Sequence, residues 1–324
     1  MKRRDAALLM AAALVSGGTV RAQAAFPNRT VKLINPFPAG SPVDVVARLL
    51  AQKLSEGWGQ SVVVENKAGA GGTMGSEQVA RSPADGYTLL VTSASSHVIA
   101  PSLRKAMPYD AVKDFIPISL VAHGPTAIVV HPSLPVKNLA EFVAYAKANP
   151  GKVAYASSGT GTILHLTGEL FASKTGVDLL HVPYKGAVPA STDLIGGQVQ
   201  AMFDSINNAM PHVRSGRLRA LAVVTPNRSS LLPDVPTAIE QGFQGLEFPA
   251  WIGVFAPAGT PRDIVANISR TLQATMSTPD SRDRMVQGGL VPALIMEGDF
   301  ARTLTQHQAI EAHLVRTAKI QQQK

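Results

Sequence analysis

Short apolar runs alternate along most of the chain with longer stretches in which apolar residues recur at helical spacing. The apolar runs predict strands at Val31–Asn35, Ser61–Glu65, Tyr87–Thr92, Thr126–Val130, Val153–Ala156, Asp178–Val182, Ala201–Asp204, Leu218–Thr225 and Trp251–Ala256. The longer stretches predict helices at Asp44–Leu54, Leu139–Ala148, Leu164–Lys174, Ala187–Gly196, Pro261–Met276 and Phe300–Ile320, and one from the glycine-rich 68–75 loop through Arg81. This alternation predicts an α/β fold with mostly parallel sheets.

The pattern restarts after Pro117, which predicts two similar α/β units connected by two chain crossings. We expect one lobe from residues 25–125 together with 246–324, and a second lobe from residues 126–245. A ligand cleft is expected between the lobes, because ligand sites favour domain interfaces.

The first residues have the pattern of a secretory signal. Lys2, Arg3 and Arg4 precede an apolar run that ends at Val15, and the small residues around Ala24 follow. The run is about half of the ~20 residues that span a bilayer. We therefore expect residues 1–24 to be removed and the remaining 300 of the 324 residues to be periplasmic. The Arg pair leaves a twin-arginine route open, although its continuation fits that motif poorly.

Composition narrows the classes of partner. The formal charge is +8, and removal of the leader, which carries +3, leaves +5. These charges are scattered and few aromatics accompany them, which argues against a nucleic-acid surface. A mild positive field favours small anions. The chain has no Cys, which excludes disulfides and thiolate metal sites.

Two loops, centred on Gly40 and Gly159 and 119 positions apart, share one design. Each follows a predicted strand, is rich in small residues and leads into a predicted helix. The first N–H groups of a helix lack partners and its dipole is positive there, so such a terminus binds anions. The two loops predict a clamp for a carboxylate.

Motifs for other chemistries are absent. In the loop 69–75 the Gly-x-Gly-x-x-Gly spacing requires glycine at position 74, where Met74 stands, and no Gly-Lys-Ser/Thr occurs. The eight histidines form no His-Glu-x-x-His pair. The sequence therefore predicts no cofactor and no metal.

A serine hydrolase remains an alternative. Ser157 and Ser158 precede Gly159, but no Gly-x-Ser-x-Gly elbow occurs there. A Ser/His/acid triad can be assembled from distant residues, so His165 either lines the cleft, caps its helix or serves as such a base.

Two further polar groups have alternative roles. Asp204 ends an apolar run and either caps the following loop or lies at the cleft rim, where it holds a water or a hinge N–H. Tyr184 and Lys185 form either a simple turn or part of an anion site.

Motifs along the whole mature chain resemble those of the Bug-type solute-binding proteins of tripartite tricarboxylate transporters. The matching segments are Pro36–Gly40 with Asp44–Arg48, Glu65–Gly72, Asp85–Leu90, Ser157–Thr162 with His165, Leu166 and Glu169, Val182–Gly186, Met202–Asp204, Leu232–Thr237 and Ala256–Pro261. The resemblance implies a two-lobed, type II periplasmic binding protein fold (a Venus flytrap) that closes on a small organic acid without catalysis.

The resemblance also implies that loop N–H groups, hydroxyls and ordered waters hold the carboxylate, and that integral-membrane transporter subunits receive it from a monomeric receptor. The ligand residues expected from the loops and the resemblance are Phe37, Ala39, Gly40, Ser41, Ser93, Ser95, Ser157, Ser158, Gly159, Thr160, Gly161, Thr162, His165, Tyr184 and Asp204.

This chain departs from the family pattern inside both loops. Ser41 stands where the family usually has glycine, Val43 replaces a small polar residue, and Pro42 removes one backbone donor. Ile163 and Leu164 are more apolar than usual. These departures predict a ligand with an apolar or aromatic body behind its carboxylate.

Overall fold

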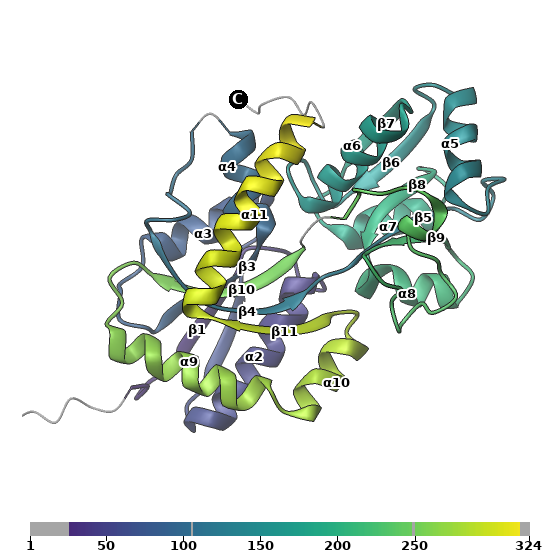
Figure 1. Ribbon diagram of the computed structural model, residues 1–324. Helices are drawn as coiled ribbons and strands as arrows, with labels where there is room; N and C mark the ends of the chain where they lie inside the picture. The colour runs from purple at the N-terminus through teal and green to yellow at the C-terminus, as the bar shows by residue number, and fades with distance from the viewer. Residues whose placement is uncertain (1–25, 105, 248–249, 318–324) are drawn as a thin grey trace, which may run out of the picture.

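The computed structural model describes residues 26–104, 106–247 and 250–317, and in it the chain forms two α/β lobes (Figure 1). The predicted leader lies outside the described residues. The α/β fold is confirmed, and each predicted strand and helix is present in the described residues with its ends shifted by a few residues, whereas the predicted helical end at 318–320 lies outside them. No helix in the described part of the chain is long and apolar enough to cross a membrane.

The first lobe is built on a six-stranded sheet. In sheet order its strands are β11 (Val291–Met296), β4 (Phe115–His123), β10 (Trp251–Pro257), β3 (Thr88–Ser93), β1 (Val31–Asn35) and β2 (Val62–Asn66). Its helices are α2 (Pro42–Trp58), α3 (Thr73–Ala80), α4 (Ala100–Leu103), α9 (Arg262–Met276), α10 (Pro279–Gln287) and α11 (Glu297–Thr317). Two short helical turns, η1 (Ala70–Gly72) and the π-helical η2 (Ser95–Ile99), lie between them.

The second lobe is built on a five-stranded sheet. In sheet order its strands are β7 (Leu179–Pro183), β6 (Val153–Ser157), β8 (Ala201–Ser205), β5 (Thr126–Val130) and β9 (Arg219–Val224). Its helices are α5 (Leu139–Ala148), α6 (Ile163–Thr175), α7 (Ala187–Ile195) and α8 (Ile206–Arg214), with one short turn at η3 (Ile239–Gln241).

Both sheets are mixed, which corrects the expectation that they are mostly parallel. Strands that end in a cleft loop, such as β1 with β3 and β6 with β8, pair in parallel. A strand that begins at a crossing runs away from the cleft, so β10 pairs antiparallel with β3, and β5 pairs antiparallel with β8. The two crossings therefore account for the antiparallel pairs that β10 and β5 form.

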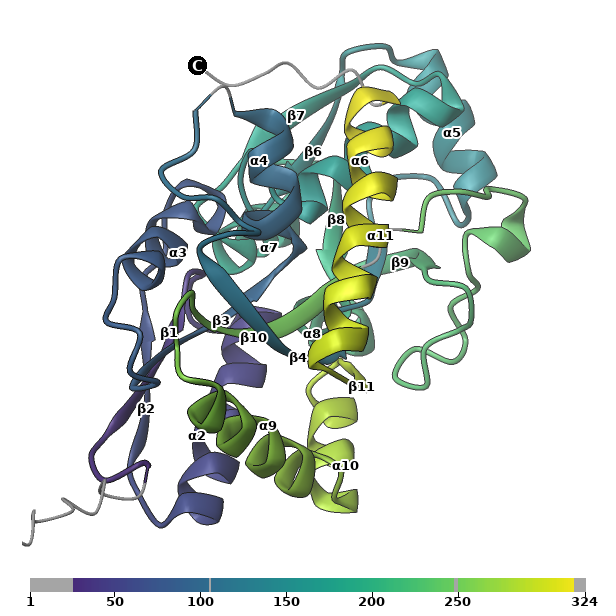
Figure 2. The ribbon, with the colours of Figure 1, turned by 60° about the vertical axis from the view of Figure 1, so that its left-hand side comes forward.

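The two crossing segments are hydrogen-bonded to each other. The Gly124 N–H, just after β4, donates to the Ala250 carbonyl, just before β10, at 2.7 Å. Helix α11 runs beside η2 of the first lobe and also packs against α6 of the second (Figure 2).

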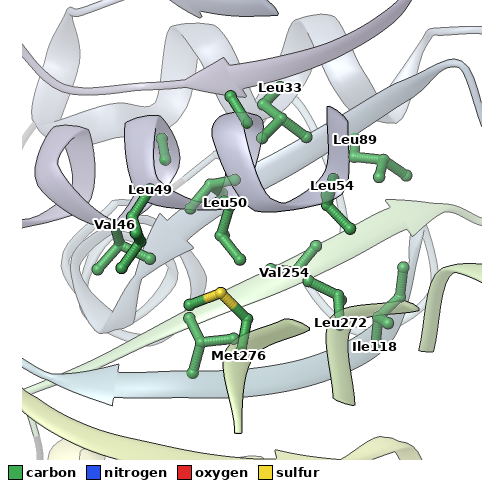
Figure 3. Packing of buried hydrophobic residues seen from close by; sticks show 14 of the residues in the cluster. Leu33, Val46, Leu49, Leu50, Leu54, Leu89, Ile118, Val254, Leu272 and Met276 are labelled. Atoms are coloured by element: carbon green, nitrogen blue, oxygen red, sulfur yellow. The ribbon is translucent and has the colours of Figure 1, made fainter. Parts of the chain in front are cut away.

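Helix α2 is anchored by its apolar face. Leu50 and Leu54 are fully buried and pack with residues of the sheet and of α9, among them Val254 and Leu272 (Figure 3). Each fully buried leucine contributes about 1.5–3 kcal/mol to folding. This packing fixes the direction in which the N-terminus of α2 points, and that terminus lies at the cleft.

The sequence patterns missed β4, α4, α8, α10 and β11. Pro117 interrupts the apolar run of β4, and the structure places it beside a register shift in the pairing with β10, where proline is tolerated within a sheet. In α8 the polar Asn207, Asn208 and the internal Pro211 conceal the helix. Helix α10 buries only Ser281 and Met285, so its apolar face is short.

Candidate functional site

A cavity of about 120 Å³ lies where the two lobes meet. The loop between β1 and α2 and the loop between β6 and α6 reach it from opposite lobes. It is lined by Phe37–Val43, Ser93, Ser95, Gly124, Ser158, Thr162–Leu164, Gly186–Pro189, Ser205 and Ala250–Ile252. The helix N-termini expected to form a clamp thus border one cavity.

At the N-terminus of α2, the side chains of the N-cap and the first turn accept hydrogen bonds from nearby backbone N–H groups. The Ser41 hydroxyl accepts a hydrogen bond from the Asp44 N–H at 3.2 Å, and the Asp44 carboxylate accepts one from the Gly40 N–H at 3.0 Å. Asp44 is buried and is also bound by Arg48 at 2.9 Å and Asn66 at 3.0 Å. Burial favours a higher pKa for Asp44, but these hydrogen bonds outweigh it and hold the pKa below its ordinary value.

The N-terminus of α6 has the same arrangement with a neutral side chain. The Thr162 hydroxyl accepts from the His165 N–H at 3.4 Å, and His165 Nδ1 accepts from the Gly161 N–H at 3.2 Å. An Nδ1 that accepts a hydrogen bond requires a neutral imidazole with its proton on Nε2. Burial, with a smaller effect of the nearby His181, lowers the pKa of His165 to about 3.

Several N–H groups that the sequence assigned to carboxylate capture are engaged within their own loops. Those of Gly40 and Gly161 bind the helix side chains described above, and that of Gly159 donates to Ser157 Oγ at 3.2 Å. They reach a ligand only by leaving these partners. Their present hydrogen bonds hold the two loops against the helix ends and so define the shape of the site.

Other backbone donors at the cavity are free. The N–H groups of Ala39 and Val43 in the first loop have no hydrogen-bond partner among the described residues, and the same holds for Ser158 and Leu164 in the second. Val43 and Leu164 are the second residues of α2 and α6. An anion at this cavity therefore has one unpaired first-turn donor available from each helix.

Two hydrogen bonds join the lobes at the cavity. The Ile163 N–H, at the start of α6, donates to Ser95 Oγ of the first lobe at 3.2 Å. Asn207 Nδ2, on α8, donates to the Gly40 carbonyl at 3.2 Å. The cleft is therefore closed in this structure.

A second chamber of about 440 Å³ adjoins the cavity. It is lined by the glycine-rich 68–72 loop and by Gly159, Tyr184 and Lys185. Phe37, Pro38, Ser158, Thr162 and Gly186 line both spaces and form their shared wall. Tyr184 donates to Asp193 Oδ2 at 2.7 Å, so its hydroxyl is held within the second lobe.

A stacked pair of histidines, His165 buried and His181 half-buried, supports the second loop. His181, on β7, approaches Ser157 Oγ with its Nε2 at 2.7 Å, and its ring stacks on His165 with centroids 4.1 Å apart. Burial lowers the pKa of His181 to about 4. The sequence patterns missed His181, because only the pairing of β6 with β7 brings it to the loop.

The Ser157–His181 pair resembles part of a hydrolytic triad, but its setting is structural. Ser157 is fully buried, and the Gly159 N–H already donates to its hydroxyl. Within the described chain, no carboxylate lies within hydrogen-bond reach of His181, so the orienting acid of a triad is missing. Ser158, which lines the cavity, donates to Thr162 at 3.2 Å and has no histidine partner.

Asp204 lies outside the cavity lining, next to the lining residue Ser205. It is fully buried, accepts from the Ser205 N–H at 2.8 Å and is bound by Asn208 Nδ2 at 2.6 Å. Burial raises its pKa to about 7 despite these hydrogen bonds. Its neighbour Ser205 lines the cavity, so Asp204 contacts the site through the adjacent backbone.

The expected ligand residues fall into three groups. Those that line the cavity are Phe37, Ala39, Gly40, Ser41, Ser93, Ser95, Ser158 and Thr162. Gly159 and Tyr184 line the adjoining chamber. Those outside the lining of both spaces are Ser157, Thr160, Gly161, His165 and Asp204.

The cavity also has lining residues that the expected set lacked. Val188 and Pro189 come from α7, and Trp251 and Ile252 from the start of β10. The position of Trp251 was available from the sequence, because a strand that returns from a second lobe begins beside the cleft. Among the described residues, no cluster of His, Asp or Glu side chains has the arrangement of a metal site.

Comparison with known proteins gives a consistent result. Residues 46–320 match the model of the tripartite tricarboxylate transporter family receptor. The structure of the periplasmic binding protein BugD is 39% identical and superposes with a TM-score of 0.86, covering 92% of this chain and 100% of that one.

Two similar structures contain ligands. A protein of R. palustris with adipate is 35% identical, with a TM-score of 0.88 and coverage of 91% of this chain and 99% of that chain. MatC from Rhodopseudomonas palustris, with bound malate, is 34% identical, with a TM-score of 0.79 and the same coverage.

Proposed function

Because the chain belongs to the tripartite tricarboxylate transporter receptor family, we propose that it is a periplasmic receptor that captures a small carboxylate between its lobes. It delivers this solute to integral-membrane subunits of a tripartite tricarboxylate-type transporter. The periplasmic location follows from the similar periplasmic binding proteins. Residues 1–24 act as the signal peptide that directs export.

The observation that carries this proposal is the convergence of two helix N-termini on one closed cavity. Val43 and Leu164 each present a first-turn N–H that has no partner among the described residues, one from each lobe. Hydroxyls of Ser41, Ser95 and other lining residues add donors around them. Hydrogen bonds to a charged group each contribute about 1.5–3 kcal/mol, so a few of them support micromolar binding, which corresponds to about −8 kcal/mol.

Capture and release use the two lobes as separate bodies. We propose that residues 25–125 with 246–324 move as one lobe and residues 126–245 as the other, about the crossing segments. The hydrogen bonds from Ile163 to Ser95 and from Asn207 to Gly40 form on closure and break on release. The receptor acts as a monomer and leaves its ligand chemically unchanged, without a metal or cofactor.

Mass spectrometry of the protein purified from its native host, under conditions that retain ligands, tests this function. We expect a small organic acid to be released on denaturation and to rebind the emptied protein unchanged. A hydrolysed product, whose formation stops in a Ser157→Ala or a Ser158→Ala variant, would establish the serine hydrolase instead. Failure of every recovered or added carboxylate to bind would contradict the receptor role.

A further inference from the structure

The cavity between the lobes has an unusual chemical lining for a site that holds an anion. None of the described residues that line it carries an ionisable side chain. Its polar groups are hydroxyls and backbone N–H groups, and the remaining wall is apolar. Charge recognition by the described lining residues therefore depends on neutral donors: helix N-termini, hydroxyls and the Trp251 indole N–H.

Hydroxyls of Ser95, Ser158 and Thr162 lie beside the N-terminus of α6, whereas that of Ser41 caps α2. Ser158 Oγ lies 3.2 Å from Thr162 Oγ1, and Ser95 Oγ lies 3.2 Å from the Ile163 N–H. The free Leu164 N–H belongs to the same helical turn. One carboxylate can therefore accept several hydrogen bonds at this end of the cavity.

The wall near the crossing segments is apolar. A Cβ built on Gly124 would lie 3.5 Å from the Pro42 ring and 3.9 Å from Ile252 Cδ1, so these residues form a contiguous surface. Trp251 adds its indole, whose buried N–H has no partner among the described residues. This indole N–H and the free Val43 N–H are the neutral donors on this side, and a second carboxylate here would meet no cation among the described lining residues.

Size sets a second limit. An apolar protein cavity of roughly 150 Å³ accommodates benzene, and the present cavity measures about 120 Å³. Its volume suits one ring or a short aliphatic chain.

The adjoining chamber offers the competing arrangement. Lys185 lines it and is exposed, so a longer ligand that passes the shared wall would bring a second carboxylate to a cation. The cavity favours a ligand with one carboxylate, whereas the chamber favours a longer ligand with two. Binding measurements with acids of each kind distinguish these arrangements.

Resting on the proposed function, we infer that the ligand is a small monocarboxylate with an apolar body, a single ring or a short chain, and that the site rejects dicarboxylates of the same size. The carboxylate binds at the α6 N-terminus and the apolar body lies against Val43, Ile252 and Trp251. A second carboxylate at that wall loses its hydration and gains only neutral donors, such as the indole N–H of Trp251, and no cation among the described lining residues.

Calorimetry with matched pairs of acids tests the inference: benzoate against isophthalate, and hexanoate against adipate. We expect the monoacid of at least one pair to bind about 100-fold more tightly than its diacid, as for a buried charge left unpaired. A diacid that binds as tightly as its monoacid or more tightly would overturn the inference and leave the receptor function intact. Absence of binding by both members of both pairs would contradict the inference, and only absence of binding by the recovered native acids would contradict the receptor function.

A positive charge introduced into the cavity lining provides a second test. Val188 lines the cavity and its residue is 54% exposed, so Val188→Lys can be accommodated and supplies the missing cation. We expect it to improve adipate binding about tenfold relative to hexanoate. Leu180→Lys is the matched control, since Leu180 is 55% exposed on β7 and lies outside the lining of the cavity.

The competing chamber is tested separately with Lys185→Ala. We expect this variant to bind the preferred monoacid with unchanged affinity. A diacid that binds the unmodified protein and loses more than tenfold affinity in the variant would place the second carboxylate at Lys185 and overturn the monocarboxylate assignment.

Discussion

The N-termini of α2 and α6 are built alike and differ in one charge. In both, the N-cap hydroxyl accepts the N–H of the third helical residue, and the side chain of that residue accepts the N–H just before the cap. The third residue is Asp44 in α2 and His165 in α6. One helix end is therefore closed by a buried carboxylate and the other by a neutral imidazole.

The sequence pattern predicted carboxylate binding by both loops alike. The difference in charge separates attraction of the carboxylate from shaping of the cavity. The Asp44 carboxylate already compensates the positive end of α2, and Pro42 removes its first N–H. The end of α6 retains its first N–H, which donates to Ser95, and its free Leu164 N–H lies beside a cap whose described side chains carry no charge. We conclude that α6 provides most of the attraction for a ligand carboxylate, and that the α2 loop mainly shapes the cavity.

The largest effect is expected when α6 receives the capping carboxylate of α2. His165→Asp puts a carboxylate at the end that attracts the ligand, and two charges about 4 Å apart repel by about 1–4 kcal/mol near a protein surface. We expect calorimetry to show about a 100-fold loss of affinity for the preferred acid. His165→Asn, which keeps a neutral acceptor for the Gly161 N–H, should stay within a few-fold of the parent. Equal affinities for all three proteins would mean that the cap charge is irrelevant to binding.

The two caps also predict different responses to acid. His165 and His181 have ordinary pKa values of 6.5, lowered in the fold to about 3 and about 4. Between these values the unfolded chain binds more protons, so the free energy of unfolding falls as the pH falls from 6.5 towards 4. Each histidine contributes about 1.4 kcal/mol per pH unit. Asp44, with a pKa below its ordinary 3.8, stabilises the fold above that pH and loses its effect only in stronger acid.

Denaturant unfolding at several pH values between 4 and 6.5 measures this difference. His165→Asn should reduce the slope of stability against pH by the contribution of one histidine. Asp204 has the opposite sign, because its raised pKa stabilises the fold at low pH and this effect is lost as the pH rises from 3.8 towards 7. It is present in both proteins and cancels in the difference. An identical slope for the parent and the variant would show that His165 titrates normally in the fold.

A proline at the start of α6 makes its first position match that of α2. Ile163→Pro removes the N–H that binds Ser95 Oγ, whereas proline is well tolerated at this helical position. Thr162 already has the extended backbone (φ −86°, ψ 161°) that a residue before proline requires. We expect a loss of affinity of about tenfold, as for one hydrogen bond of the closed state.

Ile163→Val is the matched control, because it keeps the N–H and most of the side chain. In a Ser95→Ala background the proline should have little further effect, since the acceptor is already gone. A full tenfold loss in that background would show that the bond between the lobes is not the cause.

The smallest expected effect comes from removing the charge of α2. Asp44→Asn keeps an acceptor for the Gly40 N–H but leaves that helix end more positive. We expect affinity for the acid to rise about two- to fivefold, as for one charge at a helix terminus, with some loss of stability measured in parallel by thermal unfolding. A loss of affinity greater than tenfold would identify the α2 loop as the main anchor.

The sequence was sufficient for the fold class and for locating both loops, because strand, small-residue loop and amphipathic helix are each local patterns. It did not show which N–H groups remain free. That depends on side chains such as Asp44 and His165, which turn back onto their loops only once the helix has formed. It also missed His181, whose contact with Ser157 depends on the pairing of two strands. The predicted return strand includes Ile252, but its contact with Gly124 and Pro42 depends on how the two crossing segments pair, which no local pattern encodes.

The central claim is that a small acid binds in the closed cleft with its carboxylate at the N-terminus of α6. A crystal structure of the protein with its preferred monocarboxylate tests this claim most directly. We expect a carboxylate oxygen within about 3 Å of the Leu164 nitrogen or of the Ser158 hydroxyl, with the apolar body against Trp251. A carboxylate bound at the α2 loop, in the chamber beside Lys185 or outside the cleft would contradict it.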